Sequence, residues 1–215
     1  MTQGHQHSPA PLLAGGSCAV WFMALILNLA PIGCANKPSG PYTAQEADRR
    51  NPIEAQRLTR SAATLIDSDP TQAEQLLRRA LSEDLYHGPA HNNLGVIYLK
   101  RGDLYAAASE FEWARKLIPG HPDPRLNLAL TFERAGRRAE AMSTYESALE
   151  VYPGHIPTLQ AMTRLALKWE VNLPLEELRT NLETIALNGE THAWRRWATG
   201  RLTAGPGRRS EPPGP

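Results

Sequence analysis

The chain of 215 residues is 41% hydrophobic and 21% charged, which is ordinary for a folded soluble domain. Its 23 Lys and Arg residues balance 22 Asp and Glu residues, which argues against a general nucleic-acid binder because such domains are usually strongly basic. Both cysteines, Cys18 and Cys34, lie near the amino terminus. The rest of the chain therefore has no disulfide framework, thiolate metal cluster or catalytic cysteine.

Residues 1–33 contain no Lys, Arg, Asp or Glu, and residues 18–27 form an unbroken apolar run. The run has the length of a signal-peptide hydrophobic region and is short for a membrane-spanning helix. Gly33 and Cys34 after it resemble the end of a bacterial lipoprotein signal, which implies cleavage before Cys34 and lipidation of that cysteine. Pro31, and the absence of Lys and Arg ahead of the run, depart from the lipoprotein pattern.

Three other interpretations of the apolar segment stay open: a secretory leader, an apolar tail on a cytoplasmic protein, and a misassigned start codon. Residues 34–41 are rich in Pro, Gly and Ser, which is typical of a short linker that tethers a domain to an anchor. We expect 1–33 to be a signal peptide or lipoprotein leader and 34–52 to be a linker. The expected location is a bacterial envelope, with the cytoplasm as the alternative.

After the linker, apolar spacing predicts a helix over 53–67. The residues that carry this spacing are Ile53, Leu58, Ala62, Leu65 and Ile66. Asp69 and Pro70 then predict the start of a second helix, with Asp69 as its N-cap and Gln72 reaching back to it.

From residue 88 onward the chain repeats itself at an offset of 34 residues. The first copy contains Leu94, Gly95, Tyr98, Gly102, Ala107, Phe111, Ala114 and Pro119, and the second contains Leu128, Ala129, Phe132, Gly136, Ala141, Tyr145, Ala148 and Pro153. The small residues allow two helices to approach closely and the aromatic residues fill the gaps. The glycines suit a helix end with positive φ, and the prolines end the second helix of each copy.

These residues resemble the tetratricopeptide repeat (TPR). The resemblance implies an all-α fold, an α-solenoid of antiparallel helix pairs (the TPR superhelix), with clear repeats at 88–121 and 122–155. A degenerate repeat is expected at 53–87, where Ser61 and Thr64 replace the small and aromatic residues of the first helix. A further degenerate repeat or capping helices are expected at 156–200.

The last part of the chain departs from the period at Pro174. Before it, Leu159, Met162 and Leu165 predict one helix. After it, the apolar stripe Leu175, Leu178, Leu182 and Ile185 predicts a second helix that ends at Asn188 and Gly189, and Trp194 and Trp197 are placed on a last short helix. The tail at 201–215 is expected to be disordered.

Three histidines, His87, His121 and His155, also follow the period. Equivalent residues are separated by a helix pair, about 10 Å or more, so we expect that they cannot meet one metal ion. His87 and His91 have the spacing of a helical metal site, but Pro89 between them should begin the helix and leave His87 outside it. We therefore expect packing roles and no metal.

In TPR proteins the first helices of successive repeats line a concave groove, and the resemblance places two sets of residues there. They are Asn92, Asn93, Val96, Leu99 and Lys100, and then Leu126, Asn127, Leu130, Glu133 and Arg134. Asn93 and Asn127 match the asparagine ladder of O-linked N-acetylglucosamine transferases, whose amides bind an extended peptide backbone. The alternatives are exposed polar residues or hydrogen bonds between helices.

Lys100, Arg134 and Lys168 form a second row at the same offset. One interpretation is a basic stripe for an acidic partner or a C-terminal carboxylate, and the other is that cations favour the carboxyl end of a helix. No catalytic motif is present, and Glu110 and Glu112 are expected on a solvated face. We expect a non-catalytic adaptor without cofactor that binds a protein or peptide. A cytoplasmic co-chaperone or assembly factor and a subunit of an enzyme complex are the alternatives, and self-association is left open.

Overall fold

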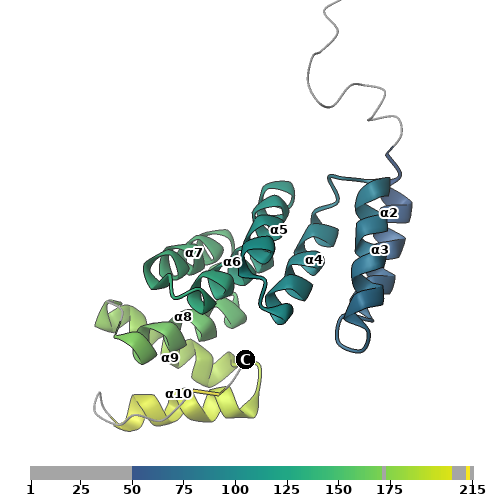
Figure 1. The fold of residues 1–215 in the computed structure, drawn as a ribbon. Coiled ribbons are helices and arrows are strands. Elements are labelled where there is room, and N and C mark those ends of the chain that lie inside the picture. Colours follow the sequence, from purple (N-terminus) through teal and green to yellow (C-terminus); the bar gives the residue numbers. More distant parts are fainter. Residues whose placement is uncertain (1–49, 171–172, 205–211, 214–215) are drawn as a thin grey trace, which may run out of the picture. The chain divides into compact units, whose positions relative to one another are not determined.

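The computed structural model describes residues 50–170, 173–204 and 212–213, and the nine helices found there belong to one compact unit (Figure 1). The helices are α2 (Pro52–Ala63), α3 (Pro70–Glu83), α4 (Gly88–Arg101), α5 (Leu104–Leu117), α6 (Asp123–Arg134), α7 (Arg138–Val151), α8 (Ile156–Trp169), α9 (Leu175–Asn188) and α10 (His192–Ala204). The prediction of an all-α array is confirmed. Among the described helices, none combines the length and apolarity that a bilayer crossing requires.

Several expectations concern residues outside the described part of the chain. The leader at 1–33, Cys34 with its predicted lipid, and the linker up to residue 49 all lie there. Most of the tail lies there too, but helix α10 continues to Ala204 and so extends beyond the expected start of the tail at 201.

The helices pack as consecutive pairs, α2 with α3, α4 with α5, and α6 with α7 (Figure 1). The first helices of the pairs, α2, α4 and α6, also contact one another in succession, and α6 contacts α8 in the same way. The first helices are therefore neighbours in the array, and the candidate site lies on the face that α4 and α6 share.

Local signals fix where the helices begin and end. Asp69 and Asp103 act as N-caps, because their carboxylates accept hydrogen bonds from backbone N–H groups three residues later, at 2.9 and 3.1 Å. Gly102 and Gly136 follow the first helices with φ of 85° and 75°, as expected for a residue without a side chain. The N–H of Asp69 is bonded to the carbonyl of Leu65, so Gln72 does not reach back to it as expected.

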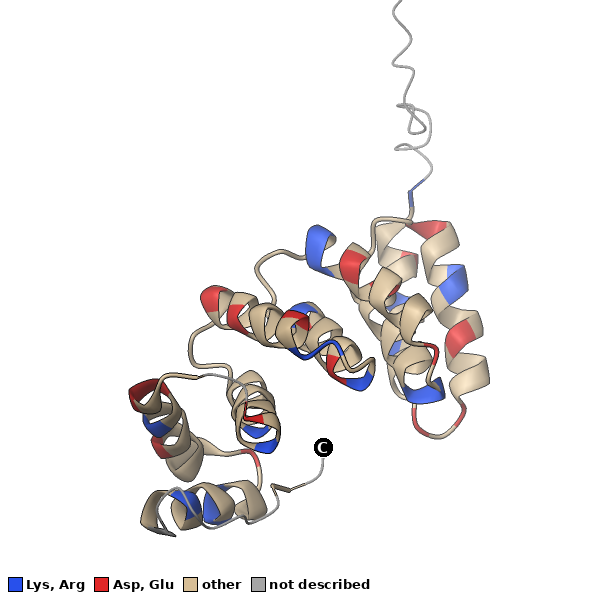
Figure 2. Cartoon of the chain, turned by 60° about the vertical axis from the view of Figure 1, so that its left-hand side comes forward, with Lys and Arg blue, Asp and Glu red and all other residues tan. Residues whose placement is uncertain are grey.

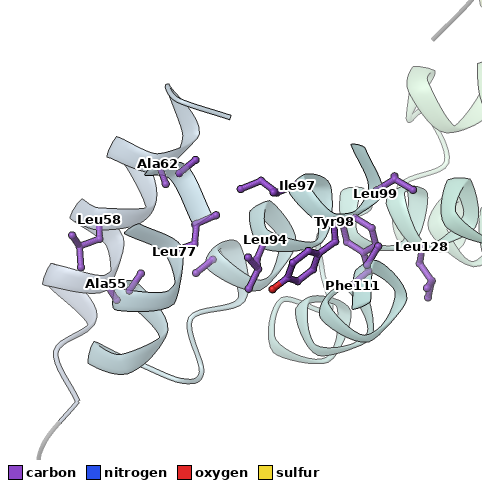
Figure 3. Packing of buried hydrophobic residues seen from close by; sticks show 14 residues of the cluster. Ala55, Leu58, Ala62, Leu77, Leu94, Ile97, Tyr98, Leu99, Phe111 and Leu128 are labelled. Atoms are coloured by element: carbon purple, nitrogen blue, oxygen red, sulfur yellow. The ribbon is translucent and has the colours of Figure 1, made fainter. Parts of the chain in front are cut away.

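The second helices carry the most regular part of the core. Three rows of side chains at the offset of 34 residues are fully buried: Ala73, Ala107 and Ala141; Leu77, Phe111 and Tyr145; and Ala80, Ala114 and Ala148. Figure 3 shows Leu77 and Phe111 within the core that α2 to α5 share. The first member of each row lies on α3, so the period extends beyond the two clear repeats.

Close approach of helices α4 and α5 depends on Gly95. A Cβ atom added there would lie 2.6 Å from Cε1 of Phe111, whose ring is fully buried. The next repeat has Ala129 at this position, which is also fully buried. The next copy places Tyr145 at the position of Phe111 and still has an alanine, so the glycine is required by the close approach of the Phe111 ring and not by the repeat itself.

Helix α2 differs from the prediction in phase and in length. Its buried residues are Ala55, Leu58, Thr59 and Ala62, and the two residues expected at the small and aromatic positions, Ser61 and Thr64, are not among them. The helix ends at Ala63 rather than near Asp67, and turns follow it up to residue 68. The four buried residues of α2 stand 36 positions before the buried His91, Leu94, Gly95 and Tyr98 of α4, so the first helix of this repeat is shifted by two residues relative to the period.

The carboxyl-terminal part is built differently. Helix α9 pairs with α10 and makes fewer contacts with α8, and a separate core forms there from Leu159, Leu182, Ile185, Trp194, Trp197 and Ala198. The two tryptophan rings meet edge to face with centroids 5.3 Å apart. Leu175, expected on the buried stripe, is 79% exposed because α9 turns only its later residues toward the core.

Candidate functional site

The shared face of helices α4 and α6 presents a chain of three asparagine side chains. Nδ2 of Asn127 donates to Oδ1 of Asn92 at 3.0 Å, and Nδ2 of Asn92 lies 3.5 Å from Oδ1 of Asn93. All three side chains are half-buried, as are Val96 and Leu130 on the same face. The structure therefore brings together five of the residues that the sequence assigned to a groove.

The hydrogen bonds among these asparagines show which of them join helices and which keep groups for a ligand. Asn127 joins helix α6 to α4, so the expectation of inter-helix hydrogen bonds holds for this residue. Within the described residues, however, Nδ2 of Asn93 and Oδ1 of Asn127 make no hydrogen bond. One donor and one acceptor are left for a ligand, which is the pair of groups that a peptide unit requires.

The three cations of the second row, Lys100, Arg134 and Lys168, each contact a different kind of partner. Lys100 forms an ion pair with Asp67, and because both side chains are largely exposed the pair contributes little to stability. Arg134 donates to the carbonyl oxygen of Leu99 at 3.0 Å, and so binds the carboxyl end of helix α4. This contact agrees with the expectation that cations favour helix carboxyl ends, although the helix is the neighbouring one.

Lys168, the third cation of the row, lies beside an aromatic ring. Its Nζ is 5.3 Å from the ring centroid of Trp169, within the range of a cation–π interaction. Arg138, at the start of helix α7, approaches the same ring with Cζ 3.8 Å from the centroid. No acidic partner of Lys168 or Arg138 exists within the described residues.

The open face ends at helix α8. Gln160 and Ala161, which follow the period of the asparagine positions, are only 2% and 7% exposed. In the amide orientation that satisfies both of its polar atoms, Gln160 donates to Oε2 of Glu190 at 2.9 Å and accepts from the backbone N–H of Glu190 at 3.0 Å. The connection between α9 and α10 therefore covers α8 at this point, and the amide row is limited to α4 and α6.

Glu133 was expected in the groove but takes part in a largely buried polar network. Its Oε2 accepts hydrogen bonds from the Tyr145 hydroxyl and from Nη2 of Arg164, both at 2.9 Å. Burial, and after it the Glu133 carboxylate, raise the pKa of Tyr145 far above its ordinary value. The network joins helices α6, α7 and α8, which indicates a structural role for Glu133.

His91 packs in the first turn of α4, as expected from its position after Pro89. Its Nδ1 lies 2.7 Å from Oε2 of Glu110 and its Nε2 lies 2.9 Å from the carbonyl oxygen of Leu85. The ring also stacks on Trp113 with a centroid distance of 5.9 Å. Glu110 is only 21% exposed, so it is not simply on a solvated face. Sequence reasoning missed this pair because its members are on different helices.

Two of the periodic histidines are closer than the repeat spacing suggests. His121 and His155 both approach the carboxylate of Asp123, at 3.6 and 3.2 Å, because Asp123 lies between the two loops. Burial lowers the pKa of His155, while Asp123 acts in the opposite direction. No group of three His, Cys, Asp or Glu side chains suited to a metal ion is found in the described part of the chain.

Known proteins resemble part of this chain. A family model described as a tetratricopeptide repeat matches residues 125–154. Tetratricopeptide repeat protein 8 of Mus musculus is 26% identical over 97 residues, which cover 45% of this chain. The chain spans about a fifth of the length of the curated relatives it matches, 19% for the mouse protein.

Two solved structures show the same fold at low sequence identity. The PilF protein of Pseudomonas aeruginosa has a TM-score of 0.61 and 20% identity, and the similarity covers 72% of this chain and 69% of that one. The first TPR domain of Spaghetti (RPAP3), bound to the HSP90 peptide SRMEEVD, has a TM-score of 0.53 and 14% identity. That similarity covers 57% of this chain and 98% of the RPAP3 chain.

Proposed function

We propose that the chain is a non-catalytic adaptor of the tetratricopeptide-repeat type that binds an extended peptide segment across helices α4 and α6, and the family match at residues 125–154 supports this proposal. The observation that carries the proposal is the asparagine chain with its unused amide groups, Nδ2 of Asn93 and Oδ1 of Asn127. A peptide backbone offers a carbonyl acceptor and an N–H donor, and these two groups complement it.

The surroundings of the amides suit an extended ligand. Val96 and Leu130 are half-buried beside them and supply apolar surface for the side chains of the ligand. The hydrogen bond between Asn127 and Asn92 holds two of the amides in place before a ligand arrives, which reduces the entropy lost on binding. The peptide-bound RPAP3 domain shares this fold and supports a peptide ligand for this chain.

A display library of peptides, selected against the full chain, tests the groove. Asn93→Ala should weaken the selected peptides about tenfold, because it removes an amide that would otherwise bond to the ligand. Asn127→Ala should weaken them as well and should also lower the free energy of unfolding by about 1 kcal/mol through the lost contact with Asn92. Thr180→Ala, on the exposed side of α9, is the control.

If the parent protein, Asn93→Ala and Thr180→Ala bind the selected peptides with equal affinity, the peptide does not bind across α4 and α6. Co-purification of an enzyme in fixed stoichiometry, by a surface that Asn93→Ala does not affect, would favour the alternative of a subunit in an enzyme complex.

We further propose that Cys34 carries lipid and tethers the adaptor to a bacterial envelope membrane. The apolar run at 18–27 and the Gly33–Cys34 pair that follows it support this proposal. Labelling with a palmitate analogue should be lost in Cys34→Ser and kept in Cys18→Ser. An unlabelled protein with an intact Met1, recovered from the cytoplasm, would favour the alternative of a cytoplasmic co-chaperone or assembly factor.

A further inference from the structure

A cluster of cations around one exposed tryptophan lies apart from the asparagine chain. We propose that Arg138, Lys168 and Trp169, together called the α7–α8 corner, bind an acidic segment of a partner protein. Arg138 and Lys168 approach the same indole ring, with Cζ 3.8 Å and Nζ 5.3 Å from its centroid. Trp169 is 44% exposed and both cations are exposed, so the corner is open to a ligand.

The charge of the corner is not balanced by the protein. In the described part of the chain neither Arg138 nor Lys168 forms an ion pair, whereas the neighbouring Arg137 pairs with Glu140. Glu170, which follows Trp169, is the nearest acid in sequence and is exposed. Two cations over one ring repel each other, and an anion between them would relieve this repulsion.

The position of Arg138 does not stabilise the fold. It is the first residue of helix α7, and a cation at the amino end of a helix costs about 0.3–1 kcal/mol because the helix dipole is positive there. An exposed cation–π contact contributes only about 0.5–1 kcal/mol in return. The arrangement is close to neutral for stability, and its net result is a positively charged surface with an aromatic floor.

The chemistry of the corner fits a run of acidic side chains. The guanidinium of Arg138 can bind a carboxylate with two parallel hydrogen bonds, and Lys168 supplies a second cation for the next carboxylate. The methylene groups of a glutamate would lie on the indole of Trp169. Binding to an anionic membrane surface usually requires about four to eight clustered basic residues, more than this corner has. The observations therefore favour an acidic protein segment.

Titration of the full chain with fluorescein-labelled hexaglutamate tests this assignment. The double variant Arg138→Gln/Lys168→Gln should bind about tenfold more weakly, since two charge-assisted contacts are lost. Trp169→Leu, which keeps both charges, should weaken binding about threefold. The matched control Arg57→Gln/Arg179→Gln removes the same charge from two exposed arginines elsewhere and should bind like the parent protein.

Several results would overturn the proposal. The first is that the two double variants bind hexaglutamate with equal affinity. The second is that the parent protein binds hexaglutamate no more tightly than hexaglutamine. The third is that Asn93→Ala loses hexaglutamate binding, which would place the site in the groove. Vesicles of phosphatidylserine in phosphatidylcholine form a further arm. If these vesicles bind through Arg138 and Lys168 while hexaglutamate does not, the corner recognises a membrane and the protein-segment assignment is wrong. A groove that fails its own peptide test leaves these expectations unchanged.

Discussion

The central helices, α4 to α7, and the carboxyl-terminal helices, α8 to α10, pack against one another through different kinds of side chain. In the central pairs, alanines and Gly95 bring the helices close together and leave the outer face of α4 and α6 half-exposed. In the last three helices, tryptophan and leucine side chains form a core of their own, and the equivalent face of α8 is buried. The period thus creates an open face, and its loss at Pro174 closes that face.

Acidic and basic side chains are interspersed along both parts, as Figure 2 shows for the described helices. Charge alone therefore does not distinguish the open part from the closed one. The two parts differ in the amides on the outer face of the first helices, where Asn93 keeps an unused donor and Gln160 is bonded to Glu190.

The largest expected effect on stability comes from removing a buried aromatic ring, and it tests whether the central core and the carboxyl-terminal core unfold separately. Phe111→Ala should lower the free energy of unfolding by about 3–5 kcal/mol, because the ring is fully buried and its loss leaves a cavity. Hydrogen exchange should then show faster opening throughout α4 and α5. Trp197→Ala should accelerate exchange mainly in α9 and α10. If both variants open all described helices equally, the two cores are one cooperative unit.

Glu133 links the two regions through Arg164 on helix α8. Glu133→Gln leaves a cation that is only 13% exposed without its partner, so we expect the free energy of unfolding to fall by about 2–3 kcal/mol in urea denaturation. Glu183→Gln breaks an exposed pair with Arg179 and should change stability by no more than about 0.5 kcal/mol. Equal losses in the two variants would show that the network adds nothing beyond a surface pair.

A double-mutant cycle tests why the first central repeat requires a glycine. Gly95→Ala should cost about 1–2 kcal/mol in the parent chain, because the new Cβ would lie against the Phe111 ring. In a Phe111→Leu background the same change should be neutral or gain up to about 1 kcal/mol from helix propensity. A similar cost in both backgrounds would mean that the aromatic ring is not the obstacle.

A smaller effect concerns the loops. Burial lowers the pKa of His155, so the unfolded chain takes up this proton more readily than the folded one, and stability should fall as pH drops through about 6.5. His155→Gln should reduce the fall in melting temperature between pH ~7.5 and ~5.5. His121→Gln, at an exposed position, is the control. A parent-like pH dependence in His155→Gln would contradict this origin.

Much of the fold could be predicted because the period repeats local chemistry. Gly102, Gly136 and the buried rows of the second helices were all readable, since each depends on neighbours one or two turns away. The phase of α2 could not be predicted from the same offset, because its buried residues stand 36 positions before their counterparts in α4 rather than 34.

The sequence predicted which residues belong to the candidate site, but it did not predict the hydrogen bonds between them. Asn127 bonds to Asn92, 35 positions earlier, because neighbouring helices are offset and equivalent residues do not lie directly opposite each other. The contact of Gln160 with Glu190 depends on a connection that follows the break in the period. Such contacts between non-equivalent positions leave no pattern in the sequence.

Photo-crosslinking from the groove tests most directly whether a partner lies across α4 and α6. A benzophenone side chain at Val96 or Leu130 should capture a partner peptide in the native host, and the crosslink should be lost when Asn93→Ala is added. The same probe at Thr180, on exposed α9, should capture little. Equal capture from Thr180, or undiminished capture from Val96 in the Asn93→Ala background, would contradict peptide binding in this groove.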